Sequence, residues 1–392
     1  MPSKEHGARR VCDSSKYTVF TDVSKFSEWI LQHINITKSR KELKPCQDGV
    51  VGKNAGWCNA ANRHDHDDFL LPKTFDTIDR ISLHDGKYLR IVNQDRSRRS
   101  TQIVDMVYDC TQRRIYWIWD EDSTIYSANV DGTDQKTFIT KAALAPTQMG
   151  VDWISRRLYW FDERKQTIEV ASLEDPNVRT VLFNFKSRSD DTTIRNIAVD
   201  PNQGKLYWIE GEQYSILNIP PFETTIEWSN LDGSERQVFD YKSVFARSMK
   251  FSQTTGELCI SIIAEWTDRR PFAPKIVSNA INCIDSSSKR NRTIVSQIRH
   301  SDAFFAITDE LVYWVENKGK ATIESVNLNG VRQKSIDIQR PLVWADRLEA
   351  VTGYCPMFYS QCANNNGGCP ENTICLLSPR DPSGKICKEI TT

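Results

Sequence analysis

Three aspartates recur at equivalent places in the sequence, and converging carboxylates are common ligands of a hydrolytic metal ion. Asp152, Asp200 and Asp309 lie in the short apolar stretches "MGVDW", "NIAVD" and "AITDE". Brought together by a fold, they could hold a divalent cation that activates water. Their regular spacing fits a structural role in a repeated element better. We therefore expect no catalytic residue, no metal and no cofactor.

Other groups capable of chemistry are few. Ser14 and Ser15 have no His and Asp partners in a recognisable pattern, so a surface loop is expected there. His64 and His66 in "HDHDD" could bind a metal or respond to pH, but they lie in a polar stretch that is typical of a linker. "DGTD" at 131–134 resembles part of a calcium loop, yet its Asp-Gly pair favours a hairpin turn.

Carboxylates also gather after three apolar runs, "YWIW", "YWFD" and "YWIE". The segments that follow these runs are acidic, and their only basic residues are Arg164 and Lys165. Aromatic residues stand beside the acids. An acidic surface with aromatic neighbours suits a protein partner that presents Lys or Arg, because charge steers the encounter and rings anchor it.

The apolar runs belong to a unit that repeats along the chain. Tyr-Trp pairs begin at Tyr116, Tyr159, Tyr207 and Tyr313, and a degenerate copy has Cys259 in the Tyr position. Each run is preceded by one apolar strand and followed by two more. Four strands in roughly 40 to 50 residues is the period of propeller blades. A β-sandwich would not be expected to repeat in this way.

The two ends of the repeat region complete a sixth blade. Phe69–Leu83 resembles the outer strands of a blade that lacks its inner strand, and Asp346–Gly353 resembles a lone inner strand. We predict that Asp346–Gly353 pairs beside Phe69–Leu71, because this pairing closes the ring and removes its free edges. The predicted fold is all-β, a six-bladed propeller with a small disulfide-rich module.

Composition favours an extracellular protein. The chain has 392 residues, a formal net charge of +0 and 11 Cys. Zero net charge gives no bulk attraction to nucleic acid or to a membrane, and no apolar run reaches the roughly 18 residues of a membrane span. Clustered cysteines near the C-terminus imply an oxidising compartment. Sequons at Asn35 and Asn291 are candidate glycosylation sites.

The Tyr-Trp motifs resemble the YWTD, or class B, repeats of the low-density lipoprotein receptor family. The resemblance covers roughly residues 66 to 392 and implies a six-bladed YWTD propeller followed by an EGF-like module. The motif's Thr is replaced by Ile118, Phe161, Ile209 and Val315, and only Asp162 keeps its Asp. Hydrogen bonds from the motif's Thr and Asp are therefore not expected in most repeats, and side-chain packing must contribute more to the stability of each blade.

The resemblance implies a non-catalytic receptor, endocytic or signalling, which binds another protein outside the cell. Two alternatives belong to other classes. A propeller hydrolase would need a metal held by several carboxylates in the central channel. A nidogen-like matrix protein or mosaic protein would use the propeller as a scaffold for assembly.

Two shorter stretches resemble other extracellular modules. Val11–Ile34 resembles the C-terminal strand and helix of chymotrypsin-like serine proteases, and Pro45–Cys58 resembles the tail of an EGF-like module. The expected domains are residues 1–38, a protease-like remnant; 39–65, a linker with a partial EGF-like tail; 66–354, the propeller; and 355–392, an EGF-like module that is cut short.

Five disulfides are expected. The EGF-like resemblance implies three of them, Cys46–Cys58, Cys362–Cys375 and Cys369–Cys387. Cys259 and Cys283 are the only cysteines of the fourth repeat and should pair with each other. Cys110 follows the inner strand of the first full blade, and Cys355 follows the closing strand of its neighbour. A bond between these two is therefore predicted, subject to a Cα separation within about 7 Å.

In a propeller, the loops after the second strand of each blade open on one face, and here these loops follow the Tyr-Trp runs. We predict that this face binds the partner, a protein ligand that presents Lys or Arg. The expected contact residues are Trp119, Asp120, Asp122, Phe161, Asp162, Glu210 and Tyr214. The competing interpretation places Trp119 and Phe161 in the core, and the acidic residues then only form a hydrated surface at the rim.

Overall fold

The computed structural model describes residues 3–6, 9–12, 68–93, 102–121, 123–140, 145–185, 192–212, 224–240, 246–269, 272–298, 304–317, 321–338, 345–353, 355 and 359–391. The chain forms two compact units, Met1–Asn62 and Arg63–Thr392. In the first, the described residues form a hairpin of β1 (Ser3–His6) and β2 (Arg9–Cys12). The predicted protease-like helix, Asn35 and the Cys46–Cys58 pair lie outside the described residues.

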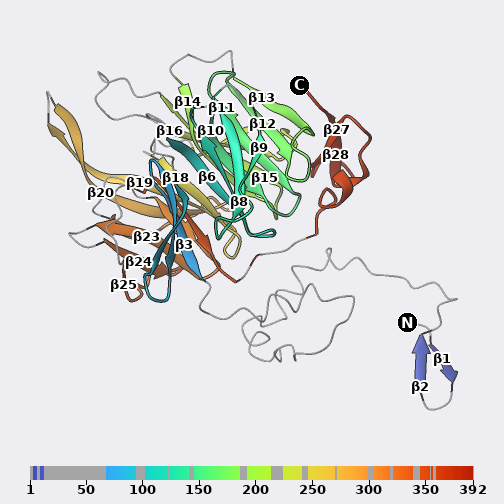
Figure 1. Cartoon of the computed structure of the whole chain (residues 1–392), viewed down its shortest axis with the longest axis horizontal. Helices are drawn as coiled ribbons and strands as arrows, with labels where there is room; N and C mark the ends of the chain where they lie inside the picture. The colour runs from blue at the N-terminus through green and yellow to red at the C-terminus, as the bar shows by residue number, and fades with distance from the viewer. Residues whose placement is uncertain are drawn as a thin grey trace. The chain divides into compact units, whose positions relative to one another are not determined.

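The second unit contains six antiparallel sheets of four strands each, arranged as the blades of a propeller (Figure 1). Blade one has β6 (Ile103–Asp109), β7 (Arg114–Trp119), β8 (Thr124–Asn129) and β9 (Lys136–Ile139); blade two has β10 (Pro146–Asp152), β11 (Arg157–Asp162), β12 (Thr167–Ser172) and β13 (Arg179–Asn184). Blade three has β14 (Thr192–Asp200), β15 (Lys205–Glu212), β16 (Thr224–Asn230) and β17 (Gln237–Asp240).

The remaining blades depart more from the repeat. Blade four has β18 (Ala246–Ser252), β19 (Glu257–Arg269), β20 (Phe272–Asp285) and β21 (Asn291–Ile298); blade five has β22 (Phe305–Ile307), β23 (Leu311–Asn317), β24 (Ala321–Asn327) and β25 (Ile336–Asp337). Blade six has β26 (Arg347–Val351), β3 (Phe69–Lys73), β4 (Thr77–Ser82) and β5 (Tyr88–Asn93). The predicted all-β, six-bladed fold is confirmed.

Closure of the ring follows the prediction. β26 is the innermost strand of blade six and pairs with β3 in an antiparallel register of Glu349 with Leu71 and Val351 with Phe69. The last strand of the ring therefore hydrogen-bonds to the first. A sheet that joins the two ends of a ring in this way leaves no inner strand without a partner.

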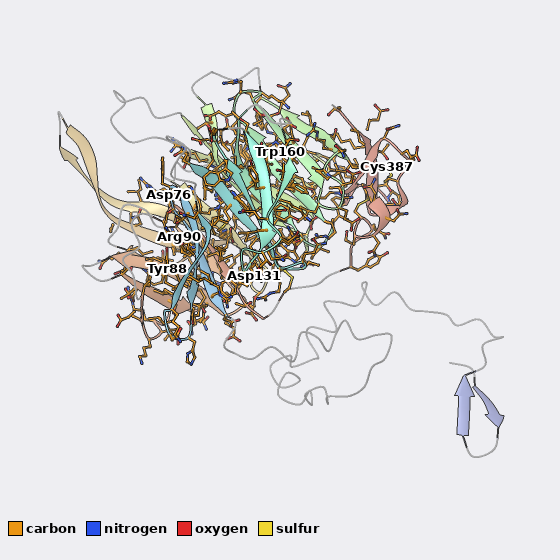
Figure 2. All side chains as sticks on the ribbon, viewed as in Figure 1. Asp76, Tyr88, Arg90, Asp131, Trp160 and Cys387 are labelled. Carbon is orange, nitrogen blue, oxygen red and sulfur yellow. A yellow bond between two sulfur atoms is a disulfide. The ribbon has the colours of Figure 1, made fainter. Side chains whose placement is uncertain are left out.

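The Tyr-Trp runs are buried because a blade has neighbours on both faces. Side chains alternate along a strand, so Tyr159 and Trp160 point to opposite faces. Tyr159 packs with Trp208 of blade three, while Trp160 packs with Val107 and Tyr116 of blade one. Figure 2 shows Trp160 among the side chains that fill the space between ribbons. A strand covered on both faces is continuously apolar, which explains "RIYWIW".

The C-terminal disulfide-rich module contains a short 3₁₀ turn, η3 (Asn365–Gly368), and a hairpin of β27 (Thr373–Leu377) and β28 (Lys385–Glu389). Disulfides Cys362–Cys375 and Cys369–Cys387 lie within the module. Cys259–Cys283 joins β19 to β20 in blade four. Cys110–Cys355 joins the end of β6 to the segment between β26 and the module. The Cα atoms of Cys110 and Cys355 are 5.5 Å apart. These are four of the five expected pairs.

The module is docked on the propeller by buried contacts. Ile374 and Leu376 belong to the same apolar cluster as Tyr159 and Trp208. The guanidinium of Arg157, which is 1% exposed, donates from Nε to the Cys375 carbonyl at 2.8 Å and from Nη2 to Asn366 Oδ1 at 2.9 Å. The module and blades two and three therefore share one core.

Candidate functional site

A depression with a volume of 840 Å³ opens at one end of the propeller. All six blades contribute to its lining through their innermost strands: blades one to four and six through the beginning of the strand, and blade five through the residue before β22. The turns after β7 and β11 complete the lining. These turns are the loops on which the sequence placed a ligand-binding face. The hollow is therefore on the propeller axis and on the predicted face.

A β-bulge occurs at the same level in four consecutive inner strands. The register shifts between residues 103 and 106 in β6, 146 and 148 in β10, 194 and 196 in β14, and 246 and 248 in β18. The residues at these shifts all line the depression, and they are Val104, Asp105, Thr147, Arg195 and Arg247. Because a bulge redirects a side chain, four blades present a side chain to one hollow.

Two side chains at or next to the bulges each tie one inner strand to the following one. Asp105 Oδ2 accepts a hydrogen bond from the Met149 backbone N–H at 2.7 Å, and Asn196 Oδ1 accepts one from the Met249 N–H at 3.1 Å. Both acceptors are buried. These bonds hold adjacent blades at a fixed spacing, so the bulged residues are presented by a rigid support.

Ion pairs form the floor of the depression. Arg347 Nε lies 2.9 Å from Asp105 Oδ1, and Lys73 Nζ lies 2.7 Å from Asp346. Burial raises the pKa of Asp105, an effect that the Arg347 charge opposes. Further along the channel Lys250 pairs with Glu349. The channel is therefore filled by paired charges from β3, β6, β18 and β26.

The structure separates the predicted contact residues into exposed and buried ones. Asp120 is exposed and Trp119 is half-buried, and Asp120 lines the depression with Glu121 and Glu163. Phe161 and Asp162 are both 0% exposed, so the prediction that they contact a ligand is wrong. Phe161 packs in the core between blades two and three.

Burial of Asp162 has a local cause. Asp162 ends β11, and its Oδ1 accepts a hydrogen bond from the Lys165 N–H at 2.9 Å, which holds the turn into β12. Glu210 is half-buried, 4.0 Å from Arg236. Asp122 and Tyr214 lie outside the described residues. Of the predicted face, Asp120 and Trp119 remain candidates for contact.

The recurrent aspartates hold turns at the other end of the inner strands. Asp152 Oδ1 accepts hydrogen bonds from the N–H groups of Ile154 and Ser155, and Asp200 Oδ1 accepts from the next turn in the same way. Asp309 lies in the turn between β22 and β23. The structural role expected of Asp152 and Asp200 is confirmed.

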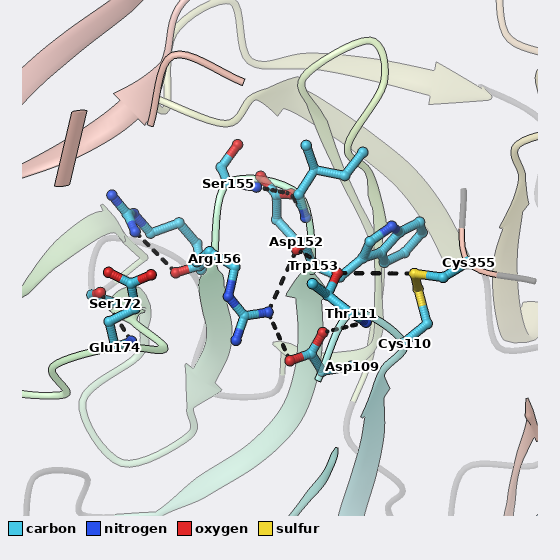
Figure 3. A network of polar contacts seen from close by, with 12 residues as sticks. Asp109, Cys110, Thr111, Asp152, Trp153, Ser155, Arg156, Ser172, Glu174 and Cys355 are labelled. Atoms are coloured by element: carbon cyan, nitrogen blue, oxygen red, sulfur yellow. Dashed lines mark hydrogen bonds and ion pairs between the residues drawn. A yellow bond between two sulfur atoms is a disulfide. The ribbon is translucent and has the colours of Figure 1, made fainter. Parts of the chain in front are cut away.

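A network at the same end joins two blades to the disulfide. Figure 3 shows Arg156 reaching Asp109, with an Nη1–Oδ2 distance of 2.7 Å, while Asp109 also accepts a hydrogen bond from the Thr111 N–H. Cys110, beside Asp109, is bonded to Cys355. In the described part of the chain, no group of three or more His, Cys, Asp and Glu side chains is placed to hold a metal ion.

Comparisons with known proteins agree with this geometry. No protein-family model matches the chain. Nidogen of Drosophila melanogaster is 31% identical over 331 residues, which cover 83% of this chain and 22% of nidogen. A chain in the crystal structure of a nidogen/laminin complex aligns with a TM-score of 0.56 and 18% identity, and the alignment covers 74% of this chain and all of that one.

This chain carries a six-bladed propeller related to that of nidogen. It spans about a fifth of the length of the Drosophila nidogen that it matches. A luciferin-regenerating enzyme aligns with a TM-score of 0.45 and 10% identity over 70% of this chain and 81% of its own, a likeness too weak to support an inference about function.

The sequence interpretation missed the arginines of the depression. Arg195 and Arg247 lie near the beginnings of inner strands, in "TIRNIAVD" and "ARSMKF", whereas the prediction considered only the loops after second strands. No sequence signal marks a bulge here. The available clue was that each Arg stands a few residues before the apolar residues of an inner strand, at equivalent places in two successive repeats.

Proposed function

We propose that this propeller is a non-catalytic, extracellular module that binds a protein partner in the depression, and that laminin is the first partner to test. The observation that carries the proposal is the depression itself, to which four adjacent blades present bulged residues. The relationship to nidogen and the nidogen/laminin complex supports the choice of laminin.

Charge in the depression defines the kind of partner. Arg195 and Arg247, on adjacent blades, are half-buried in the lining, and a guanidinium is suited to a two-point contact with a carboxylate. Asp120 and Glu121 on the rim are exposed and suit Lys or Arg. A protruding loop with a central carboxylate and flanking basic residues would satisfy both.

A matrix scaffold is favoured over an endocytic or signalling receptor. Both classes use a propeller with a disulfide-rich module, and the disulfides require an oxidising compartment in either case. Nidogen of Drosophila melanogaster, 31% identical over 331 residues, supports the matrix role and an extracellular location. A full-length transcript that encodes a membrane span would favour the receptor instead.

Charge reversal in the depression tests the proposal. Arg195→Glu and Arg247→Glu should each weaken binding to immobilised laminin at least about tenfold, mainly by faster dissociation, as measured by surface plasmon resonance. Lys334→Glu is the matched control, because Lys334 is exposed in the connection from β24 to β25 at the opposite end of the blades. It should bind as wild type.

The acidic rim predicts a different kinetic effect. Asp120→Lys combined with Glu121→Lys should slow association a few-fold and reduce its dependence on salt, without changing folding. If wild type binds laminin but every depression and rim variant binds at the wild-type rate, the ligand site lies elsewhere. If wild type does not bind laminin, laminin is not the partner.

A further inference from the structure

A second cavity lies on the propeller axis, at the end opposite the depression. Its volume is 180 Å³, and its lining comes from the inner strands of all six blades and from turns that follow them. Thr254, in the turn after β18, lines the cavity and is exposed, so the cavity opens at this end. Arg347 lines both hollows and therefore lies between them. We call this smaller hollow the lower cavity.

One layer of the lower cavity's lining contains a lysine where neighbouring blades have a small apolar residue. Val107, Gly150 and Ala198 each stand two residues before the end of an inner strand, and each pairs with the Tyr of a Tyr-Trp motif. Lys250 has the same position in β18 and pairs with Cys259. All four inner-strand residues line the cavity. The small side chains of blades one to three therefore leave room for the lysine of blade four.

The surroundings of Lys250 combine low exposure with a few charged groups. Its side chain is 16% exposed, and its Nζ forms an ion pair with Glu349 of β26. Blade five lies between these two blades, so the pair crosses the channel. Arg347 is the next charge, with its Nε 2.9 Å from Asp105 Oδ1 and 4.0 Å from Glu349 Oε1. Asp309, in the turn after β22, lines the same cavity.

These surroundings favour the nucleophilic form of the lysine. The neutral amine is the form that attacks an electrophile, and both burial and a neighbouring cation favour it. Burial lowers the pKa of the Lys250 amine and the Arg347 charge lowers it further, whereas Glu349 and Asp105 partly oppose the shift. The neutral fraction of this amine is therefore larger than that of an ordinary exposed lysine at the same pH.

An ion pair that only braces the channel is the simpler explanation of these contacts. A buried ion pair is weak evidence for stability, however, because desolvation offsets the attraction between its charges. Here the pair faces a cavity well above the roughly 10–15 Å³ that one water molecule requires. A carboxylate beside the amine can also accept and return a proton. An amine, a proton acceptor and space for a small molecule therefore occur together.

We propose that Lys250 is a covalent modification site for small aldehydes that enter the lower cavity. The amine nitrogen attacks the carbonyl carbon, the C=O bond breaks, and a C=N bond forms. The nitrogen loses two protons, which Glu349 carries in turn and which leave with the carbonyl oxygen as water. No oxidant or reductant is needed. The modification is stoichiometric, and it goes beyond the proposed binding of laminin and does not depend on it.

Reductive trapping on the intact protein tests this proposal. The folded protein is incubated near neutral pH with acetaldehyde and cyanoborohydride, which reduces the imine to a stable ethyl-lysine, and peptide mapping by mass spectrometry gives the rate for each lysine. Lys250 should be modified at least about threefold faster than Lys334, an exposed lysine of the same molecule. An aldehyde-bearing dextran is too large for the lower cavity, so it should modify Lys334 and leave Lys250 unmodified.

Lys250→Arg is the matched variant, because it keeps a positive charge beside Glu349 but has no primary amine. The fast phase of modification should disappear in this variant. If Lys250 in the wild type reacts no faster than Lys334, or reacts equally well with the dextran aldehyde, the proposal is overturned and the ion pair only braces the channel. Both of these measurements use the wild-type protein, so the decision does not depend on whether the variant folds.

Discussion

Arg157 joins the propeller to the C-terminal module, and its replacement should measure that docking. The side chain donates to the Cys375 carbonyl, to Asn366 Oδ1 and, at 2.9 Å, to the Arg156 carbonyl. Burial lowers its pKa, so burial of the charge offsets part of what the three bonds contribute. Arg157→Met removes the donors and keeps much of the volume.

The magnitude follows from what the substitution leaves behind. The Arg156 carbonyl still accepts from Leu173 N–H, and Asn366 Oδ1 still accepts from Cys375 N–H. The Cys375 carbonyl loses its bond to the guanidinium, at a cost of about 1–3 kcal/mol for a buried acceptor. With lost packing of the stem, we expect the free energy of unfolding to fall by about 2–3 kcal/mol.

Urea unfolding followed by tryptophan fluorescence checks this value. Arg157→Lys keeps the charge but not the planar fork, and it should give an intermediate loss. Arg380→Met is the control, since Arg380 also links the module to the propeller, through Glu235, but both side chains are exposed or nearly so. A loss for Arg157→Met no larger than that of Arg380→Met would refute the reasoning.

Three further outcomes are expected. Burial raises the pKa of Asp200 from 3.8 to about 6, so the folded state binds this proton more tightly than the unfolded state does. The free energy of unfolding of the wild type should therefore fall as pH rises from about 4 to 6. Asp200→Asn should remove this contribution, at most about 3 kcal/mol, in urea titrations at pH 4 and pH 6. Cys110→Ser with Cys355→Ser should lower stability by about 2–5 kcal/mol in the same assay, and an unchanged midpoint would contradict a structural role for this disulfide. Exposed Asn291, the first residue of β21, should carry an N-linked glycan in secreted protein, seen as a mass loss on enzymatic deglycosylation that is absent from Asn291→Gln.

Strand parity explains why the prediction for Phe161 failed. Alternation places Tyr159 and Phe161 on the same face of β11, toward blade three, and both are in that core. The sequence therefore contained the information that Phe161 is buried. The prediction assigned it to a ligand face because it lies next to a loop, but distance from a strand end does not determine which face a side chain occupies.

The architecture of the propeller was predictable from the amino-acid sequence. The two cysteine pairs of the C-terminal module were implied by the resemblance to EGF-like modules. Blade number, ring closure through β26 and the Cys259–Cys283 pair in blade four follow from short-range patterns: alternation, turns and spacing. These patterns are local, since each blade is one contiguous supersecondary unit apart from the split one. Closure was predictable because two incomplete blades have complementary missing strands.

The residues that line the depression could not be identified without the tertiary structure. Arg195 and Arg247 are distant in sequence from Asp120, and they line one depression because inner strands of successive blades meet at the axis. The bulges that present them are shifts in hydrogen-bond register, which depend on how two strands pair and not on either strand's composition. Burial of Arg157 likewise depends on a module more than 200 residues away along the chain.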